Sequence, residues 1–299
     1  MSVVINTNVD SLKVQSTLTN ATNSLAQAMQ RMSSGLKITS AKDDAAGTVI
    51  SARMNVQLDG NKICQNNVQN ANALLSTSEG NIDVVLDNVS RIRDLTLQAK
   101  NGTYSEKEIE AMQAEVKERL AEIDRVSSSS KFSQLQLFGD ATLSANGITF
   151  QVGQNADAEG KTDNVINADK SIFKGVTFSA LTGVQGAFNL KTIKENSAKA
   201  SGQTGEYTNF DTALTKLDSA IDDLTNRKSL IGSAQNRLTS ALNTLTTQYT
   251  NLSSAKSIIT DADIAEEASV FTQNNILQQV STSLLAQANQ APAIALSLI

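Results

Sequence analysis

The chain has 299 residues, of which 40% are hydrophobic but only 4% aromatic, and it contains no His, one Cys (Cys64) and one Pro (Pro292). A net charge of −5 without a Lys/Arg cluster argues against nucleic-acid binding, which depends on basic patches. Without His, and with one Cys that excludes an intramolecular disulfide, we expect no enzyme active site, no cofactor and no metal centre.

Signals for membrane insertion and cleaved secretion are missing from the sequence. Residues 1–15 have neither the basic start nor the apolar stretch of a cleavable secretory signal. No apolar run approaches the ~20 residues that span a bilayer. We therefore expect no membrane partner.

The N-terminal segment predicts a first long helix. Its apolar residues recur at alternating spacings of three and four, which places them on a seam, a line of residues along which two helices pack. Asp43-Asp44 then marks a polar break, which we favour over a cation site because nothing else in the sequence supports a metal. The seam residues are Val14, Leu18, Ala21, Leu25, Ala28 and Met32.

A second, longer helical stretch repeats this spacing. Cys64 lies seven residues before its seam residue Ala71 and is interpreted as a small buried apolar group, not as a nucleophile. The seam residues are Val68, Ala71, Leu75, Ser78, Ile82, Val85, Val89, Ile92, Thr96 and Ala99.

A turn at Asn101-Gly102 separates this stretch from a shorter amphipathic helix over 109–123. Ser105 and Glu108 have the spacing of a capping box at its start. From about Ser127 to Gly205 the heptads disappear, and short β-type runs at 147–153 and 175–178 predict a small region of hairpins and loops.

The C-terminal half carries the most regular seam. One heptad series is aliphatic throughout, and the interleaved series, which starts at Leu214, includes Lys228 and Gln235. The first and last helices must then run back toward each other as an antiparallel pair. The aliphatic series is Leu217, Leu224, Ile231, Leu238, Leu245, Leu252 and Ile259.

The last segment begins with an acidic cluster at 261–267, which we interpret as a helix N-terminus because carboxylates favour that end of the dipole. From Ala268 to Ile299 no side chain is charged, and Ile276, Leu285 and Leu296 lie off the predicted seam. Such a helix has more apolar surface than one partner covers, so we expect it to pack against further copies of the chain; a peripheral helix of one globular bundle is the alternative. The predicted seam is Val270, Leu277, Leu284, Ala291 and Leu298, interleaved with Gln273, Val280, Gln287 and Ile294.

Several motifs at both ends resemble the signatures of bacterial flagellins, the subunits of the flagellar filament. The resemblance covers about 1–140 and 206–299. Its motifs are Ile5–Asn8, Arg31–Ile38, Ala41–Gly47, Ile276–Gln279, Leu285–Gln290 and Leu296–Ile299.

The resemblance implies a mainly α fold in which the paired N- and C-terminal segments form long antiparallel coiled-coil helices around a small β-rich central region. Residues 1–42 with 261–299 would form an inner coiled-coil domain, 43–140 with 206–260 a helical rod domain, and 141–205 a hairpin and loop region without large outer domains. The function implied is polymerisation into the extracellular filament for motility.

The resemblance also implies partners. The family is exported unfolded by the flagellar type III system without signal cleavage, with an export chaperone for the C-terminal segment, a cap protein at the growing tip and hook–filament junction proteins. Self-association would use the seam at Val14, Leu18, Leu25, Met32, Leu277, Leu284, Ala291 and Leu298. A hook–filament junction protein or a surface homologue that binds polysaccharide are the alternative functions.

Finally, the family contacts a host Toll-like receptor. Arg91, Leu95 and Glu115 occupy matching positions here and Arg119 follows Glu115 by one turn, whereas Ser90 departs from the usual Gln. All four are candidate contacts. We expect Arg91 and Leu95, one helical turn apart, to form an exposed pair off the seam. An ordinary solvated helix face is the alternative.

Overall fold

A computed structural model describes residues 8–155, 163–182, 188–198 and 209–296, with side chains omitted at 196–198 and 291–296. Two compact units divide the chain: a terminal unit (1–59 and 249–299) and a central unit (60–248). The domain boundaries predicted from the sequence, 42/43 and 260/261, differ from the boundaries of these units. They coincide with the breaks between consecutive helices. The long helices are α1 (Val9–Ser34), α2 (Ala45–Lys100), α3 (Glu106–Ser129), α7 (Phe210–Thr260) and α8 (Ile264–Leu296).

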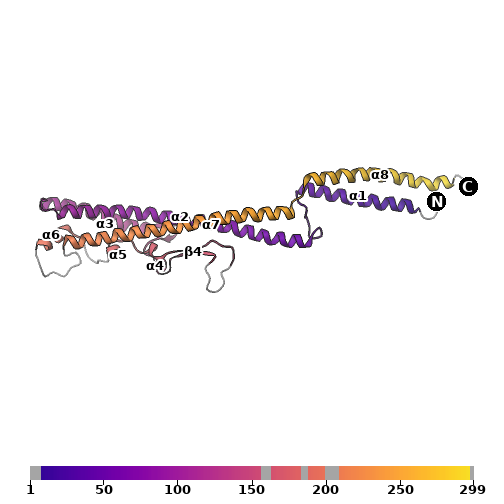
Figure 1. The fold of residues 1–299 in the computed structure, drawn as a ribbon. Helices are drawn as coiled ribbons and strands as arrows, with labels where there is room; N and C mark the ends of the chain where they lie inside the picture. The colour runs from indigo at the N-terminus through magenta and orange to yellow at the C-terminus, as the bar shows by residue number, and fades with distance from the viewer. Residues whose placement is uncertain (1–7, 156–162, 183–187, 199–208, 297–299) are drawn as a thin grey trace. The chain divides into compact units, whose positions relative to one another are not determined.

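In the terminal unit, α1 and α8 lie side by side (Figure 1). The Asn8 side chain caps α1 by accepting a hydrogen bond from Ser11 N at 3.0 Å, and its Nδ2 donates to Ala288 O at 2.8 Å. Because Arg31 near the other end of α1 contacts Glu267 near the start of α8, the two helices are antiparallel. The predicted pairing of the chain ends is therefore confirmed.

The seam between these helices follows the prediction on α1 but not on α8. Val270 is half-buried, but Leu277 and Leu284 are exposed, and Leu285, which we expected off the seam, is half-buried. This prediction was wrong because apolar residues surround α8, so their spacing does not single out one face. The covered positions of α8 include Glu267, Phe271, Asn274, Gln278, Ser281, Leu285 and Ala288.

The break between α1 and α2 is a hydrogen-bonded turn. Lys37 N donates to Thr260 O at 2.7 Å, which links the turn to the end of α7. Asp43 Oδ2 accepts hydrogen bonds from the hydroxyl and the backbone N–H of both Thr39 and Ser40. The Thr39 hydroxyl and these N–H groups lower the pKa of Asp43. The interpretation of Asp43-Asp44 as a polar break is confirmed.

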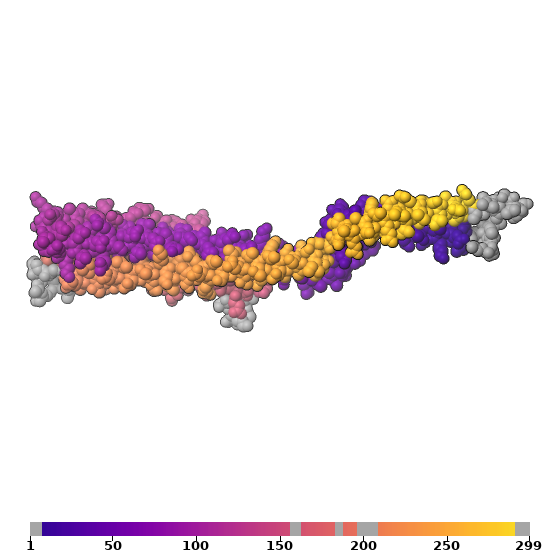
Figure 2. All heavy atoms as spheres, turned by 45° about the horizontal axis from the view of Figure 1, so that its top comes forward, coloured from indigo at the N-terminus to yellow at the C-terminus, as the bar shows by residue number. Residues whose placement is uncertain are grey.

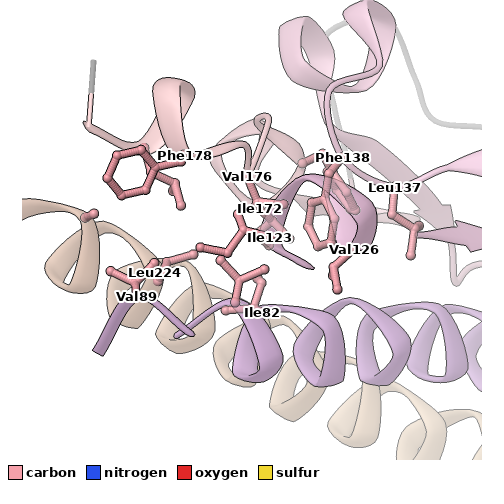
Figure 3. Close-up of a cluster of buried hydrophobic side chains, with 14 of the residues drawn as sticks. Ile82, Val89, Ile123, Val126, Leu137, Phe138, Ile172, Val176, Phe178 and Leu224 are labelled. Atoms are coloured by element: carbon pink, nitrogen blue, oxygen red, sulfur yellow. The ribbon is translucent and has the colours of Figure 1, made fainter. Parts of the chain in front are cut away.

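The central unit packs α2, α3 and α7 around one core (Figure 3). Arg93 Nε contacts Asp218 Oδ1 at 2.5 Å and Lys228 Nζ contacts Asp83 Oδ1 at 2.8 Å, so α2 and α7 are antiparallel. All ten predicted seam residues of the second stretch are buried, as are five residues of the aliphatic series on α7: Leu217, Leu224, Ile231, Leu238 and Leu245.

The interleaved series on α7 is shifted by one position from the prediction. Lys228 and Gln235 are only half-buried, whereas the preceding residue is covered in each case. The segment between α3 and α7 contacts this face of α7, since Arg227 Nη1 donates a hydrogen bond to Lys174 O at 2.9 Å. The covered residues are Ala213, Ala220, Arg227 and Ala234.

The segment between α3 and α7 contains short helices as well as the expected strand pairs. The run at 147–153 includes strand β3, as predicted, but Val176 and Phe178 do not form a strand; both are buried in the core that the helices share (Figure 3). The pairs β1–β2 and β3–β4 are antiparallel. The elements are β1 (Lys131–Phe132), β2 (Leu135–Gln136), α4 (Ala141–Asn146), β3 (Ile148–Gln151), β4 (Val165–Ala168), η1 (Lys170–Phe173), α5 (Phe178–Thr182) and α6 (Leu190–Ala198).

Candidate assembly surface and receptor-contact cluster

An apolar stripe runs along the face of α8 that α1 does not cover. Ile276 is 56% exposed, and Leu277, Val280 and Leu284 are exposed to a similar degree. Spacings of four and seven place these residues on one side of the helix. Figure 2 shows the surface of α8, in yellow, open along the α1–α8 pair.

Among the described residues, no helix has the length and apolarity to cross a membrane.

Exposed apolar side chains also lie on α1. Val9 is 66% exposed, and Leu12 and Met29 are at least half exposed. The pair formed by α1 and α8 therefore has apolar side chains on both helices outside its own seam. This amount of open apolar surface is typical of an interaction site.

An ion pair that the sequence analysis missed joins the two helices. Arg31 Nη1 lies 3.0 Å from Glu267 Oε1, and both side chains are largely covered. The signal available in the sequence was an excess of basic side chains in residues 1–40 and of acidic ones in 261–299, but such sums cannot identify the partners. A covered ion pair disfavours those shifted pairings that would leave either charge covered and unpaired.

The predicted self-association residues thus fall into three groups. Val14, Leu18, Leu25 and Met32 are half-buried on the α1 side of the seam within one chain. Leu277 and Leu284 lie on the exposed stripe. The side chain of Ala291, and Leu298 as a whole, lie outside the described residues.

Three of the four predicted receptor contacts form one network on α2 and α3. Arg91 binds Glu115 with two hydrogen bonds, Nε–Oε1 at 2.7 Å and Nη2–Oε2 at 3.0 Å. Arg119 Nη2 lies 3.4 Å from Glu115 Oε1, and its Nη1 donates to Asn88 Oδ1 at 3.2 Å. The Arg91 guanidinium lowers the pKa of Glu115. Asn88, Arg91, Glu115 and Arg119 make up the candidate receptor-contact cluster, in which Asn88 was not predicted from the sequence.

Leu95 does not belong to this cluster. It is only 2% exposed and packs in the core of the central unit. We predicted an exposed Leu95 because a two-helix seam through Val89 and Ile92 would leave it outside. Packing of α2 against more than one helix makes the buried face wider than a single seam, so this prediction was wrong.

The remaining candidates have structural roles. Cys64 is buried as predicted, and burial raises the pKa of its thiol. Asp263 Oδ1 accepts a hydrogen bond from Ala265 N at 2.8 Å, which confirms that the acidic cluster is a helix N-terminus. In the described part of the chain, no group of three His, Cys, Asp or Glu side chains is placed to hold a metal ion.

Comparisons with known proteins agree at both ends of the chain. Residues 5–142 match the family described as the bacterial flagellin N-terminal helical region, and residues 214–299 match the bacterial flagellin C-terminal helical region. The chain is 37% identical to the flagellin of Xenorhabdus nematophila, with all of both chains covered.

It is also 30% identical to the flagellar filament 33 kDa core protein of Treponema phagedenis, covering 99% of this chain and 100% of that one. A solved structure from Vibrio parahaemolyticus, described as flagellar hook-associated, shares the fold with a TM-score of 0.51 and 19% identity, over 73% of this chain and 99% of that chain. From the matches at both ends and the full-length relatives, we conclude that the chain belongs to the bacterial flagellin family.

Proposed function

We propose that this chain is a structural subunit that polymerises into a flagellar filament, and that α1 and α8 form its assembly interface. One observation supports this most directly: the stripe of Ile276, Leu277, Val280 and Leu284 remains exposed after α1 and α8 have paired. Burying the exposed half of one such side chain stabilises an interface by about 0.7–1.5 kcal/mol. Neighbouring copies can supply that burial repeatedly along a polymer.

Full-length similarity to filament proteins favours this role over the alternatives. The identity to the Treponema filament core protein extends over 99% of the chain. Likeness to the hook-associated structure shows only the shared fold. We further propose that the chain is not an enzyme, because its family consists of structural proteins.

Seeded elongation tests the proposal. Purified chain added to sheared filament fragments should extend them into long filaments, whereas a chain lacking residues 1–40 and 260–299 should not. Circular dichroism of the truncated chain provides the control that the central unit remains helical. Normal elongation by a folded truncated chain would contradict the proposed interface.

We propose that the helix breaks at 42/43 and 260/261 separate an inner coiled-coil domain from a helical rod domain in the polymer. The chain would leave the cell through the flagellar type III system, with a chaperone on the C-terminal segment, and meet junction and cap proteins at the ends of the filament. These partners rest on the family. We expect that deletion of the C-terminal segment abolishes export. A deletion within 141–205 should leave export unaffected.

We also propose that Arg91, Glu115 and Arg119 can contact a host Toll-like receptor, because their side chains are partly exposed and held in one network. Leu95 is left out because it is buried. Arg91→Ala should weaken receptor signalling by purified monomer. Arg125→Ala is a matched control, because Arg125 lies on α3 in a separate ion pair with Glu122. Equal responses from both variants would remove the cluster from the receptor surface.

A further inference from the structure

The turn between α2 and α3 contains the pair Asn101-Gly102. Neither the space around Gly102 nor its backbone conformation requires a glycine there. A methyl group added at Gly102 would meet no atom within 4 Å, and the φ angle of Gly102 is not in the left-handed range. The backbone here therefore accepts any small residue. Both Asn101 and Gly102 are exposed.

The bonding of this turn leaves the reacting groups available. Thr103 N lies 3.5 Å from Asn101 Oδ1, a contact that polarises the side-chain amide toward attack at Cγ. Asn101 N donates to Gln98 O at 3.0 Å, but the nitrogen that can attack the Asn101 side chain is that of the next residue, Gly102. In the described part of the chain, no backbone hydrogen bond uses Gly102 N as a donor.

A second Asn–Gly pair in the chain, Asn146-Gly147, provides an internal comparison. Gly147 N donates to Leu143 O at 2.8 Å, so this amide is already engaged. Gly147 has φ 73°, and a Cβ there would collide with Ala168 O, so the fold itself requires glycine. The backbone amide of the glycine is thus hydrogen-bonded in Asn146-Gly147 but makes no backbone hydrogen bond among the described residues in Asn101-Gly102.

From this contrast we propose that Asn101 is a site of spontaneous chemical modification that converts its amide to a carboxylate. Deprotonated Gly102 N attacks Asn101 Cγ, a C–N bond forms, and the side-chain nitrogen leaves as ammonia. Water then opens the resulting cyclic imide at either carbonyl. The products are aspartate or isoaspartate at position 101, and the only co-reactants are water and hydroxide.

The product places a negative charge directly after the last residue of α2. Lys100, which contacts Asp211 Oδ1 at 2.5 Å, would gain a second carboxylate neighbour. A negative charge at a helix C-terminus opposes the helix dipole. In the isoaspartate form the chain also gains a backbone methylene in the turn that leads to the capping box at Ser105.

The test is incubation of the full-length, folded chain in mildly alkaline buffer, followed by peptide mass spectrometry. Digestion should be acidic and brief, with a protease that does not cleave after Lys100, so that the digest does not create the product. We expect conversion at Asn101 to be roughly tenfold faster than at Asn146, because Gly147 must first break a hydrogen bond and open locally. In denaturant, the two rates should become similar.

Gly102→Ala should slow conversion at Asn101 by a similar factor without changing helicity, since its methyl group has free space but hinders attack. Equal rates at Asn101 and Asn146 in the folded chain would overturn the proposal. So would an Asn101 that stays intact in the folded chain but converts in denaturant.

Discussion

At the residue scale, Arg91 and Leu95 on α2 show how neighbours one turn apart differ in environment. Arg91 contacts Glu115 on α3 across a partly exposed surface, while Leu95 is covered by the core. A leucine in that position contributes to the stability of the central unit and cannot contact a partner without local unfolding. Its substitution therefore measures folding and not recognition.

We predict that Leu95→Ala lowers the free energy of unfolding by about 2–5 kcal/mol, because it leaves a cavity in the core. Leu97, two residues further along the same helix, is 50% exposed. Leu97→Ala should change stability by no more than about 0.5 kcal/mol. Urea unfolding followed by circular dichroism measures both. Equal effects would mean that Leu95 is not buried in solution.

The Arg91–Glu115 pair predicts a pH dependence. Because the pKa of Glu115 is lower in the folded chain than its usual value of 4.5, the unfolded chain binds the proton first on acidification. The stabilisation is therefore complete above pH 4.5 and disappears as the pH falls through the folded pKa. Because solvent screens the charges at this partly exposed site, the pair stabilises the folded chain by less than about 1 kcal/mol.

Glu115→Gln should therefore be less stable than the natural chain at neutral pH, and the difference should shrink in acid. Glu118→Gln is the control, since Glu118 is exposed and has no ion pair among the described residues. Urea titrations across the acid range measure both variants. A difference that stays constant, or grows on acidification, would contradict the assigned pKa direction.

At the element scale, replacing glycine with alanine should raise the stability of the folded chain in one element and lower it in another. Gly80 lies inside α2, where an added Cβ meets nothing within 4 Å. Gly80→Ala should stabilise the chain by about 0.5–1 kcal/mol, because it lowers the entropy of the unfolded state. Gly147→Ala should destabilise it by about 1–3 kcal/mol, because the residue has positive φ and its Cβ would strike a backbone oxygen. Thermal unfolding measures the stability of both variants. If both substitutions raised or both lowered the melting temperature, the prediction would be wrong.

How well an element could be predicted depended on how many partners it packs against. The ten seam residues of α2 between Val68 and Ala99 were found from spacing alone, because eight of them are apolar and recur at steps of three and four. Leu95 was missed because other helices widen that face. On α8 the apolar residues surround the helix, so spacing could not show whether Leu284 or Leu285 faces α1.

Side-chain networks were the least predictable features. The Arg31–Glu267 pair and the link from Arg119 to Asn88 join residues far apart in sequence. Their distances depend on the helix register, which composition does not give. The capping box at Ser105 was predictable, by contrast, because both partners lie within one turn: Ser105 N donates to Glu108 Oε2 at 2.6 Å.

At the scale of the whole molecule, assembly should depend on the face of α8 that pairing leaves open. Val280 and Leu284 are one turn apart on that face and off the seam with α1. Replacing both with Gln removes apolar contact area, adds no charge to α8 and leaves it able to form a helix. The pairing of α1 with α8 should survive, because its seam residues are unchanged.

We predict that this double variant raises the lowest chain concentration that elongates filament seeds by roughly ten- to a hundredfold, since burying the exposed halves of two such side chains contributes about 1.5–3 kcal/mol together. Val84→Gln with Leu97→Gln is the matched control, because both residues are exposed on α2. If the control pair impaired elongation equally, any loss of exposed apolar surface would suffice. Unchanged elongation by the α8 variant would mean that neighbouring copies do not bury this stripe, and the assembly interface would have to lie elsewhere on the chain.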